Sequence, residues 1–270
     1  GLQITTAGVS VVGVERFVQL STGSGNDTLD FSAWNFDDNV ATGDGNDTIL
    51  TGLGRDTVDG YNGDNVLVLD YSTINSKMLS EAKGISNYGP YGKFRAEDNS
   101  TSVDYYNISR FKITGTTLSD DIRLWGGADT VIAGDGDDVI ECGGGNDSID
   151  GGAGNDTLMR LDLSASKDNL KIDNKGLQIT TAGVSVVGVE RFVQLSTGSG
   201  NDTLDFSAWN FDDNVATGDG NDTILTGLGR DTVDGYNGDN VLVLDYSTIN
   251  SKMLSEAKGI SNYGPYGKFR

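Results

Sequence analysis

The sequence has no histidine, one cysteine (Cys142), two prolines, and 19 basic against 40 acidic residues in a total of 270. It therefore lacks the histidine and cysteine ligands that zinc and copper prefer, and it cannot form an intrachain disulfide. Without histidine, Cys142 also lacks the usual base that activates a nucleophilic thiol. The formal net charge of −21 argues against nucleic acid and anionic membranes as partners, because both would repel the chain.

Long apolar stretches are missing as well. No run approaches the roughly 18 residues of a membrane-spanning helix, so no membrane insertion is expected, and no signal-peptide pattern opens the sequence. The apolar fraction is 36%, which is low for a conventional core. The 39 glycines are about twice the ordinary share. We therefore expect something besides an ordinary hydrophobic core to stabilise the fold.

A large internal repeat organises the chain. Residues 1–95 recur without a change as residues 176–270, an offset of 175 residues. Because the sequence starts in the middle of this unit, without an initiator Met, we expect it to come from a longer tandem array. The expected domains are a partial repeat (1–95, with a roll at 22–68), a half-unit (96–175, roll at 115–159) and a second copy (176–270, roll at 197–243), with 96–270 forming one complete unit.

A nine-residue repeat lies inside the large one. Residues 115–159 divide without a gap into GTTLSDDIR, LWGGADTVI, AGDGDDVIE, CGGGNDSID and GGAGNDTLM. The same register fits 22–68 and 197–243, where a two-residue insertion, Phe31 and Ser32 in the first copy, interrupts the spacing. Over these fifteen turns, position 8 is always apolar, and position 6 is Asp except at Asn65 and Asn240. So regular a pattern does not arise by chance.

The nonapeptides resemble the G-G-x-G-x-D-x-U-x repeat of the RTX (repeats-in-toxin) family. The resemblance covers about half of the chain. It implies an all-β fold of right-handed parallel β-roll (β-solenoid) blocks, joined here by β-rich linkers into an elongated molecule. It also implies calcium binding and type I secretion, with the chain unfolded in the low-calcium cytosol and folding outside the cell.

The spacing itself explains why such a roll needs a cation. Two nonapeptides make one coil, so the position-6 carboxylates of turns n and n+2 stack about 4.8 Å apart. At an effective dielectric of about 20, two charges at that distance repel by roughly 3.5 kcal/mol. Several such pairs would outweigh the stability of a typical domain. Two carboxylates and the carbonyls of glycine-rich loops form an all-oxygen cage that suits Ca²⁺.

The candidate metal ligands follow from this geometry. Stacked pairs are Asp27/Asp47, Asp38/Asp56 and Asp47/Asn65, then Asp120/Asp138, Asp129/Asp147 and Asp138/Asp156, and finally Asp202/Asp222, Asp213/Asp231 and Asp222/Asn240. Three pairs in each of three arrays allow up to about nine calcium ions. Backbone carbonyls are expected near Gly43, Gly45, Gly134, Gly136, Gly143, Gly145, Gly152, Gly154, Gly218 and Gly220. Asp44, Asp135 and Asp219, at position 3, are expected to add a further oxygen.

The linkers between the arrays read as mostly β. Residues 164–195 alternate β-branched residues with glycine turns and predict three or four strands. Residues 72–83 predict a short helix with Ile74, Met78, Leu79 and Ala82 on one face, ended by Gly84. We expect the linkers to continue the solenoid, because the ends of a roll expose apolar side chains and strand edges that must be covered.

Other chemistry is less favoured by the residues. Trp34, Trp125 and Trp209 share position 2 of the second turn in their arrays and are expected to pack on the adjoining loop. Tyr88, Tyr91, Tyr105 and Tyr106 are expected to be packing residues. Paired carboxylates serve glycoside hydrolysis in other proteins, but here they recur with the metal loops. No catalytic residues are expected, and we interpret the chain as a non-enzyme.

The sequence as a whole favours a calcium-binding spacer or stalk of a large secreted or cell-surface bacterial protein, of the adhesin or surface-layer type. Its expected partners are calcium ions and neighbouring repeats of the same chain. One alternative is a secretion and folding module attached to a secreted enzyme or toxin. A domain of unrelated sequence beside the array would favour it. A second alternative is a carbohydrate-binding module that uses the Trp and Tyr positions.

Overall fold

The computed structural model describes residues 4–6, 9–11, 18–86, 89–173, 179–181, 183–248, 255–261 and 264–269. Every regular element in these ranges is a β-strand, and they contain no helix that could cross a membrane. The chain forms two compact units, Gly1–Asp156 and Thr157–Arg270. The all-β class and the parallel stacking expected from the nonapeptides are both confirmed.

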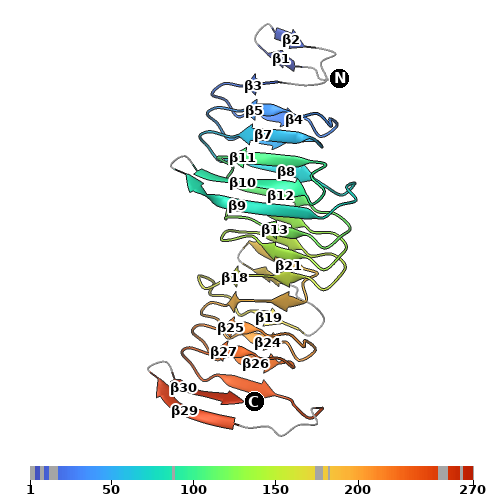
Figure 1. Ribbon diagram of the computed structural model, residues 1–270. Coiled ribbons are helices and arrows are strands. Elements are labelled where there is room, and N and C mark those ends of the chain that lie inside the picture. The colour runs from blue at the N-terminus through green and yellow to red at the C-terminus, as the bar shows by residue number, and fades with distance from the viewer. Residues whose placement is uncertain are drawn as a thin grey trace. The chain divides into compact units, whose positions relative to one another are not determined.

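Unit 1 contains two stacked sheets, seen as the blue-to-green strands of Figure 1. One sheet has the order β3–β5–β7–β11–β10–β9–β13–β15, and the other has the order β4–β6–β8–β12–β14–β16. A separate antiparallel pair, β1 and β2, precedes them. The strands are β1 Ile4–Thr6, β2 Val9–Val11, β3 Leu20–Ser21, β4 Thr28–Asp30, β5 Asn39–Ala41, β6 Thr48–Leu50, β7 Arg55–Asp59, β8 Val66–Asp70, β9 Met78–Ser86, β10 Gly89–Ala96, β11 Ser102–Tyr106, β12 Arg110–Thr114, β13 Asp121–Arg123, β14 Thr130–Ile132, β15 Val139–Glu141 and β16 Ser148–Asp150.

Unit 2 repeats this arrangement with the orders β18–β23–β25–β27 and β19–β24–β26–β28. It also contains the parallel pair β17–β22 and two antiparallel pairs, β20–β21 and β29–β30. Its strands are β17 Thr157–Leu158, β18 Leu161–Asp162, β19 Lys171–Ile172, β20 Ile179–Thr181, β21 Val184–Val187, β22 Arg191–Phe192, β23 Leu195–Ser196, β24 Thr203–Asp205, β25 Asn214–Ala216, β26 Thr223–Thr226, β27 Thr232–Asp234, β28 Val241–Leu244, β29 Ser255–Ser261 and β30 Gly264–Phe269. The strands predicted over 164–195 are confirmed by β19 to β22.

Consecutive nonapeptides place their strands in alternate sheets. In β14 and β16, Val131 pairs with Ile149, which is two nonapeptides later, and β13 and β15 pair Ile122 with Ile140 in the same way. Two nonapeptides therefore complete one coil. The inward residue at position 8 forms the core, with 2% exposure or less at Val40, Ile49, Val58, Leu67, Ile122, Val131, Ile140, Ile149, Leu158, Leu204, Val215 and Ile224.

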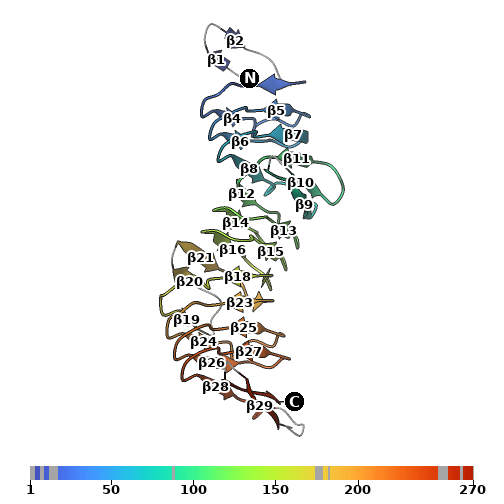
Figure 2. The same cartoon turned by 90° about the vertical axis from the view of Figure 1, so that its left-hand side faces the viewer.

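The helix predicted over residues 72–83 is wrong. Residues from Met78 onward form β9, which pairs with β10 over eight positions as an antiparallel hairpin. Figure 2 shows β9, β10 and β11 side by side. A helix of three turns is marginal in water without tertiary packing, whereas a strand here completes a sheet. Tertiary pairing has overridden the helical spacing of Ile74, Met78 and Leu79.

The linker after the first array continues the solenoid. In this linker, β11 pairs in parallel with β7, and β12 pairs in parallel with β8 on one side and with β14 on the other. Its core is aromatic: the rings of Phe94, Tyr105 and Phe111 lie with centroids 5.0 to 5.6 Å apart, and all three side chains are 1% exposed or less. The buried core therefore continues through this linker as an aromatic cluster.

Candidate metal centre

The position-6 side chains of alternate turns form a ladder on the loops. The backbone N–H of each residue donates to Oδ1 of the side chain one coil later. In unit 1, Asp120 donates to Asp138 (2.7 Å), Asp129 to Asp147 (3.0 Å) and Asp138 to Asp156 (2.9 Å), and the first array repeats this with Asp27 to Asp47, Asp38 to Asp56 and Asp47 to Asn65. In unit 2, the pairs are Asp202 to Asp222, Asp213 to Asp231 and Asp222 to Asn240. All nine predicted pairs are stacked as neighbours.

This bonding uses one carboxylate oxygen and leaves the other available for a cation. Asp138 is 1% exposed and its Oδ2 has no hydrogen-bond partner. The same holds for one buried oxygen in each of Asp27, Asp47, Asp129, Asp202, Asp213, Asp222 and Asp231. A buried ionised oxygen without a donor is costly unless a cation neutralises it. Each of these oxygens would therefore be stabilised by a bound cation.

Burial favours the protonated form of several of these side chains and so raises their pKa values. Desolvation raises the pKa of Asp56, Asp129, Asp138 and Asp213 to about 7, although backbone N–H donors to Asp56, Asp129 and Asp138 oppose the shift. The pKa values of Asp120, Asp147, Asp202 and Asp231 are also raised, first by burial. In Asp138 the neighbouring carboxylates of Asp120 and Asp156 add to the effect.

Glycine lets the loops of successive coils approach one another. Gly145 has φ +143° and Gly152 has φ +93°, a region that L-residues rarely adopt. A Cβ on Gly145 would overlap the carbonyl oxygen of Gly127, and a Cβ on Gly152 would overlap that of Gly134. Carbonyl oxygens are thus directed at the next loop along the stack, beside the carboxylates. The predicted positions at Gly43, Gly45, Gly134, Gly136, Gly143, Gly154, Gly218 and Gly220 also have positive φ.

A second ladder, at position 5, was not predicted from the sequence. Here the side chain accepts from the loop one coil later: Asn155 N–H donates to Asp137 Oδ1 (2.9 Å), and Asp64 N–H donates to Asn46 Oδ1 (2.9 Å). In unit 2, Asn221 N–H donates to Asn201 Oδ1 (2.8 Å). The recurrence of Asn or Asp directly before the position-6 residue is the signal that would have revealed it. The two ladders hold each loop from both sides.

The position-3 aspartates lie on the outside of the loops. Asp44 accepts from Asn62 Nδ2 (2.8 Å), and Asp219 accepts from Asn237 Nδ2 (2.7 Å), each in an exposed contact. Asp135 is exposed as well. The side chains of Asp44 and Asp219 are therefore engaged with neighbouring loops, and the oxygens best placed for a cation are those of position 6 and of the loop backbone.

The donor set is consistent with Ca²⁺. Within the part of the chain that the structure describes, no three His, Cys, Asp or Glu side chains gather into a group that could hold a metal ion by themselves, so backbone carbonyls would have to complete any ligand set. Ca²⁺ takes six to eight oxygens and accepts carbonyls as readily as carboxylates. Two stacked aspartates and the glycine carbonyls between them would hold it. When bound, the ion would supply the positive charge that the stacked carboxylates lack.

Two residues of the position-6 ladder depart from the pattern of unpartnered oxygens. Asn65 occupies position 6 at the end of the first array, and its Nδ2 donates to Gly60 O (2.7 Å) and Asn107 O (3.2 Å). At the start of the middle array, Asp120 Oδ2 accepts from Thr116 N–H (2.7 Å). At Asn65 and Asp120, hydrogen-bond donors of the protein therefore occupy the oxygens that a cation would otherwise need.

The tryptophans do not all behave alike. Trp209 is 6% exposed and packs against Phe206 (centroids 5.0 Å apart) and Phe192 (5.8 Å). Trp34 lies 5.5 Å from Phe31, the buried residue of the two-residue insertion. Trp125, in contrast, is 38% exposed. The packing role expected for this position holds for Trp34 and Trp209 only.

The tyrosines and the cysteine are mainly structural. Tyr105 is in the aromatic core, while Tyr91 and Tyr106 stack at the surface with centroids 6.4 Å apart. Tyr88 lies outside the described residues. Cys142 is buried, and desolvation first, then the carboxylates of Asp147 and Asp129, raises the pKa of its thiol. A thiol of that kind is a poor nucleophile.

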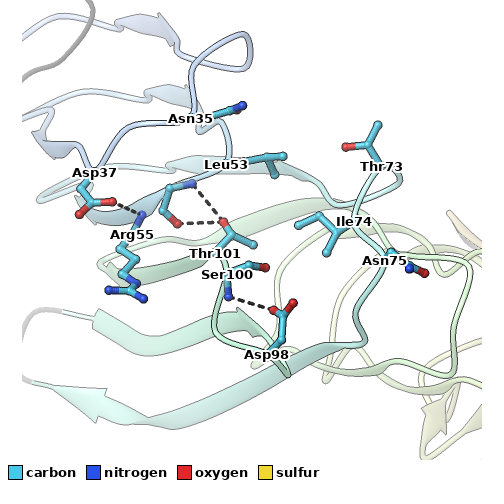
Figure 3. A pocket seen from close by; sticks show the side chains of 11 residues that line it. Asn35, Asp37, Leu53, Arg55, Thr73, Ile74, Asn75, Asp98, Ser100 and Thr101 are labelled. Atoms are coloured by element: carbon cyan, nitrogen blue, oxygen red, sulfur yellow. Dashed lines mark hydrogen bonds between the residues drawn. The ribbon is translucent and has the colours of Figure 1, made fainter.

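A polar groove of about 640 Å³ lies between turns of the first array and the linker turn that contains Thr101. Figure 3 shows its lining, which includes Asn35, Asp37, Arg55, Asp98 and Ser100. Its acidic groups already accept bonds within the protein: Arg55 N–H donates to Asp37 (3.0 Å), and Ser100 N–H donates to Asp98 (2.9 Å).

Comparison with known protein families also points to calcium. Residues 35–67, 126–158 and 210–242 match the family model described as the RTX calcium-binding nonapeptide repeat (4 copies). These segments contain the ladder aspartates from Asp38 to Asp56, from Asp129 to Asp156 and from Asp213 to Asp231. A search of curated proteins found no match.

Proposed function

Because the chain carries three blocks of RTX calcium-binding nonapeptide repeats, we propose that it is a calcium-dependent spacer or stalk segment of a large secreted or cell-surface bacterial protein. The repeat family supports a calcium-binding module of a secreted protein. The observation that carries the calcium assignment is the row of buried, unpartnered carboxylate oxygens on the position-6 ladder. The ligands we propose are twelve of the thirteen position-6 aspartates and the adjoining glycine carbonyls. Asp120 is the exception, because protein donors already occupy both of its carboxylate oxygens.

The spacer role rests on the 175-residue repeat. The two identical copies pair their strands in the same register: Ile49 pairs with Leu67 in the first, and Ile224 with Leu242 in the second. Copying such a unit lengthens the stack and adds metal ligands, and it adds no new kind of site. We propose that 96–270 is one complete unit of this array and that calcium at the extracellular, near-millimolar level folds it after export through type I secretion.

Calcium titration followed by circular dichroism tests this function. In chelator at pH 8, the β signal of the 270-residue chain should be much weaker than in calcium, and the missing part should appear cooperatively as calcium is added. Binding only to the folded state stabilises it by mass action, so the transition temperature should rise with the calcium concentration. A β signal that is as strong in chelator as in calcium would overturn the proposal.

A further inference from the structure

Residues 60–123 run from the last turn of the first array, through the linker, to the first turn of the middle array. This segment differs from the remaining turns of the arrays, and we call it the junction. It contains β8 to β13 and the aromatic core of Phe94, Tyr105 and Phe111. The inference below rests on the proposed calcium-dependent function. It concerns what happens at the rungs where the ladder enters and leaves this segment.

Asn65 ends the first ladder with its own hydrogen-bond donors. Its side chain is fully buried (0% exposed) and its Oδ1 accepts from Asp47 N–H (3.0 Å), as a ladder aspartate would. Its Nδ2 donates to the carbonyls of Gly60 (2.7 Å) and Asn107 (3.2 Å). The amide group thus holds together two backbone oxygens of the kind that a cation holds elsewhere, and it does so without charge.

Thr101 ends the ladder on the other side of the same coil. Its hydroxyl donates to Gly54 O (2.8 Å) and accepts from Gly54 N–H (3.1 Å), and the residue is 2% exposed (Figure 3). Thr101 is part of the linker turn that stacks on the loop of Asp56, where the next metal loop would otherwise lie. A hydroxyl again satisfies the glycine backbone at that rung.

Asp120 begins the middle ladder already saturated. Its Oδ1 accepts from Met78 N–H (2.7 Å) and from the Thr116 hydroxyl (2.9 Å), and its Oδ2 accepts from Thr116 N–H (2.7 Å). The equivalent aspartate of the first array, Asp27, has Gly23 where Asp120 has Thr116, and its Oδ2 lacks a partner. The presence of Thr116 therefore distinguishes the closed rung from an open one.

The junction also covers the apolar end of the first array. Leu67 is fully buried (0% exposed) where β8 pairs with β12, and Phe111 is its register partner. β12 therefore covers the apolar position-8 residue of the last coil of the first array.

We propose that the junction is a calcium-independent segment, in which hydrogen-bond donors of Asn65, Thr101 and Thr116 occupy oxygens of the kind that Ca²⁺ would coordinate in the arrays. It remains folded when calcium is removed, while the ladders on either side open. The calcium-dependent coils are thereby divided into blocks that fold against a junction that is already folded. Folding on calcium addition then starts from the junction, because its core is already formed.

Hydrogen exchange of the 270-residue chain, in chelator and in calcium, tests this proposal. Residues 1–95 and 176–270 give identical peptides, so the informative peptides come from 96–175. In chelator, amides of 102–114 should exchange at least about tenfold more slowly than those of 130–158, and calcium should protect both. Exchange that is equally fast in both segments in chelator overturns the junction proposal and leaves the calcium function intact. Equal protection that calcium does not change overturns both.

Three variants separate the proposed role from ordinary packing. Asn65→Asp removes the amide donors and restores the carboxylate pair with Asp47, so peptides of 102–114 should lose protection in chelator and regain it in calcium. The matched control Asn240→Asp makes the same change in the second copy and should leave 102–114 protected in chelator. Thr101→Val removes only the hydroxyl and should also cost protection in chelator. Unchanged protection in both Asn65→Asp and Thr101→Val, or protection that calcium fails to restore in Asn65→Asp, overturns the proposal.

Discussion

At the scale of single residues, a ladder aspartate such as Asp138 has two separate roles. One oxygen accepts a backbone N–H from the preceding coil, as Asp138 Oδ1 does from Asp120, and this bond does not require a metal. The other oxygen is buried without a partner. Because the two oxygens belong to one carboxylate, the group helps to order the loop and at the same time penalises it while it remains charged and without a cation.

Asp138→Asn should therefore have opposite effects with and without calcium. The amide retains an acceptor for Asp120 and is neutral, so in chelator the variant should be at least as stable as the parent. In calcium it is a weaker ligand, and the midpoint of calcium-induced folding should rise about tenfold, which corresponds to about 1.4 kcal/mol. Circular dichroism during calcium titration measures both.

The exposed position-3 residue of the same turn provides the control. Asp135→Asn should shift the midpoint of calcium-induced folding by the equivalent of less than about 0.5 kcal/mol, as is usual for surface changes. Equal shifts in the two variants would show that the ladder position has no special role in binding.

Acid should partly replace calcium. The folded-state pKa values of Asp56, Asp129, Asp138 and Asp213 are about 7, above the ordinary 3.8. The folded chain therefore binds more protons than the unfolded chain, and its stability rises as pH falls from above 7 towards 4. In chelator, the β signal should increase between pH 8 and pH 5. A metal-free signal that is constant over this range, or that falls, would contradict the assignment of the burial penalty to these carboxylates.

At the scale of elements, the loop depends on close stacking of backbones. Gly145 has a positive φ, and a Cβ there would overlap Gly127 O, while Gly144, its neighbour in the same turn, has nothing within 4 Å of a built Cβ. The two glycines are neighbours in one turn, but they differ in the space available at the Cβ position. They therefore form a matched pair for mutation.

Gly145→Ala should destabilise the calcium-bound chain by about 1–3 kcal/mol, since it forces a strained backbone and pushes two loops apart. Gly144→Ala should change the stability by less than about 0.5 kcal/mol. Thermal unfolding in saturating calcium measures the difference. Similar melting temperatures for both variants would contradict the stacked-loop geometry.

The sequence predicted the periodic part of the molecule and missed the parts that depend on distant contacts. The strand, the loop and the stacking of Asp138 on Asp156 follow from spacing alone, because each involves residues a fixed distance apart. The strand at Met78–Ser86 does not, since it forms only by pairing with β10 and through the bond from Met78 N–H to Asp120. Likewise, nothing near Asn65 in the sequence indicates its bond to Asn107.

At the scale of the whole molecule, charge is the dominant quantity. The chain has a net charge of −21, and a large part of it lies on buried ladder carboxylates. Neutralisation by ions within the loops is therefore coupled to folding over many sites, and the choice of ion should be selective. Mg²⁺ requires a compact octahedral shell and gives up its water reluctantly.

Millimolar Mg²⁺ should accordingly fail to induce the β signal that Ca²⁺ induces at the same concentration. The matched measurement is a titration of the chelator-treated chain with either ion at constant ionic strength. Equal responses to the two ions would indicate that general screening of charge, and no defined oxygen cage, drives the transition.

The two ladders also give the stack a direction. Position-6 side chains accept from the coil before them, as Asp138 does from Asp120, and position-5 side chains accept from the coil after them, as Asp137 does from Asn155. The side of a coil that faces the preceding coil, its leading end, thus offers position-6 side-chain acceptors and position-5 backbone N–H donors. The side that faces the following coil, its trailing end, offers position-6 N–H donors and position-5 side-chain acceptors. Two leading ends would set acceptor against acceptor and donor against donor. New coils can extend the row only head to tail, so the polarity of the chain is maintained through every added repeat.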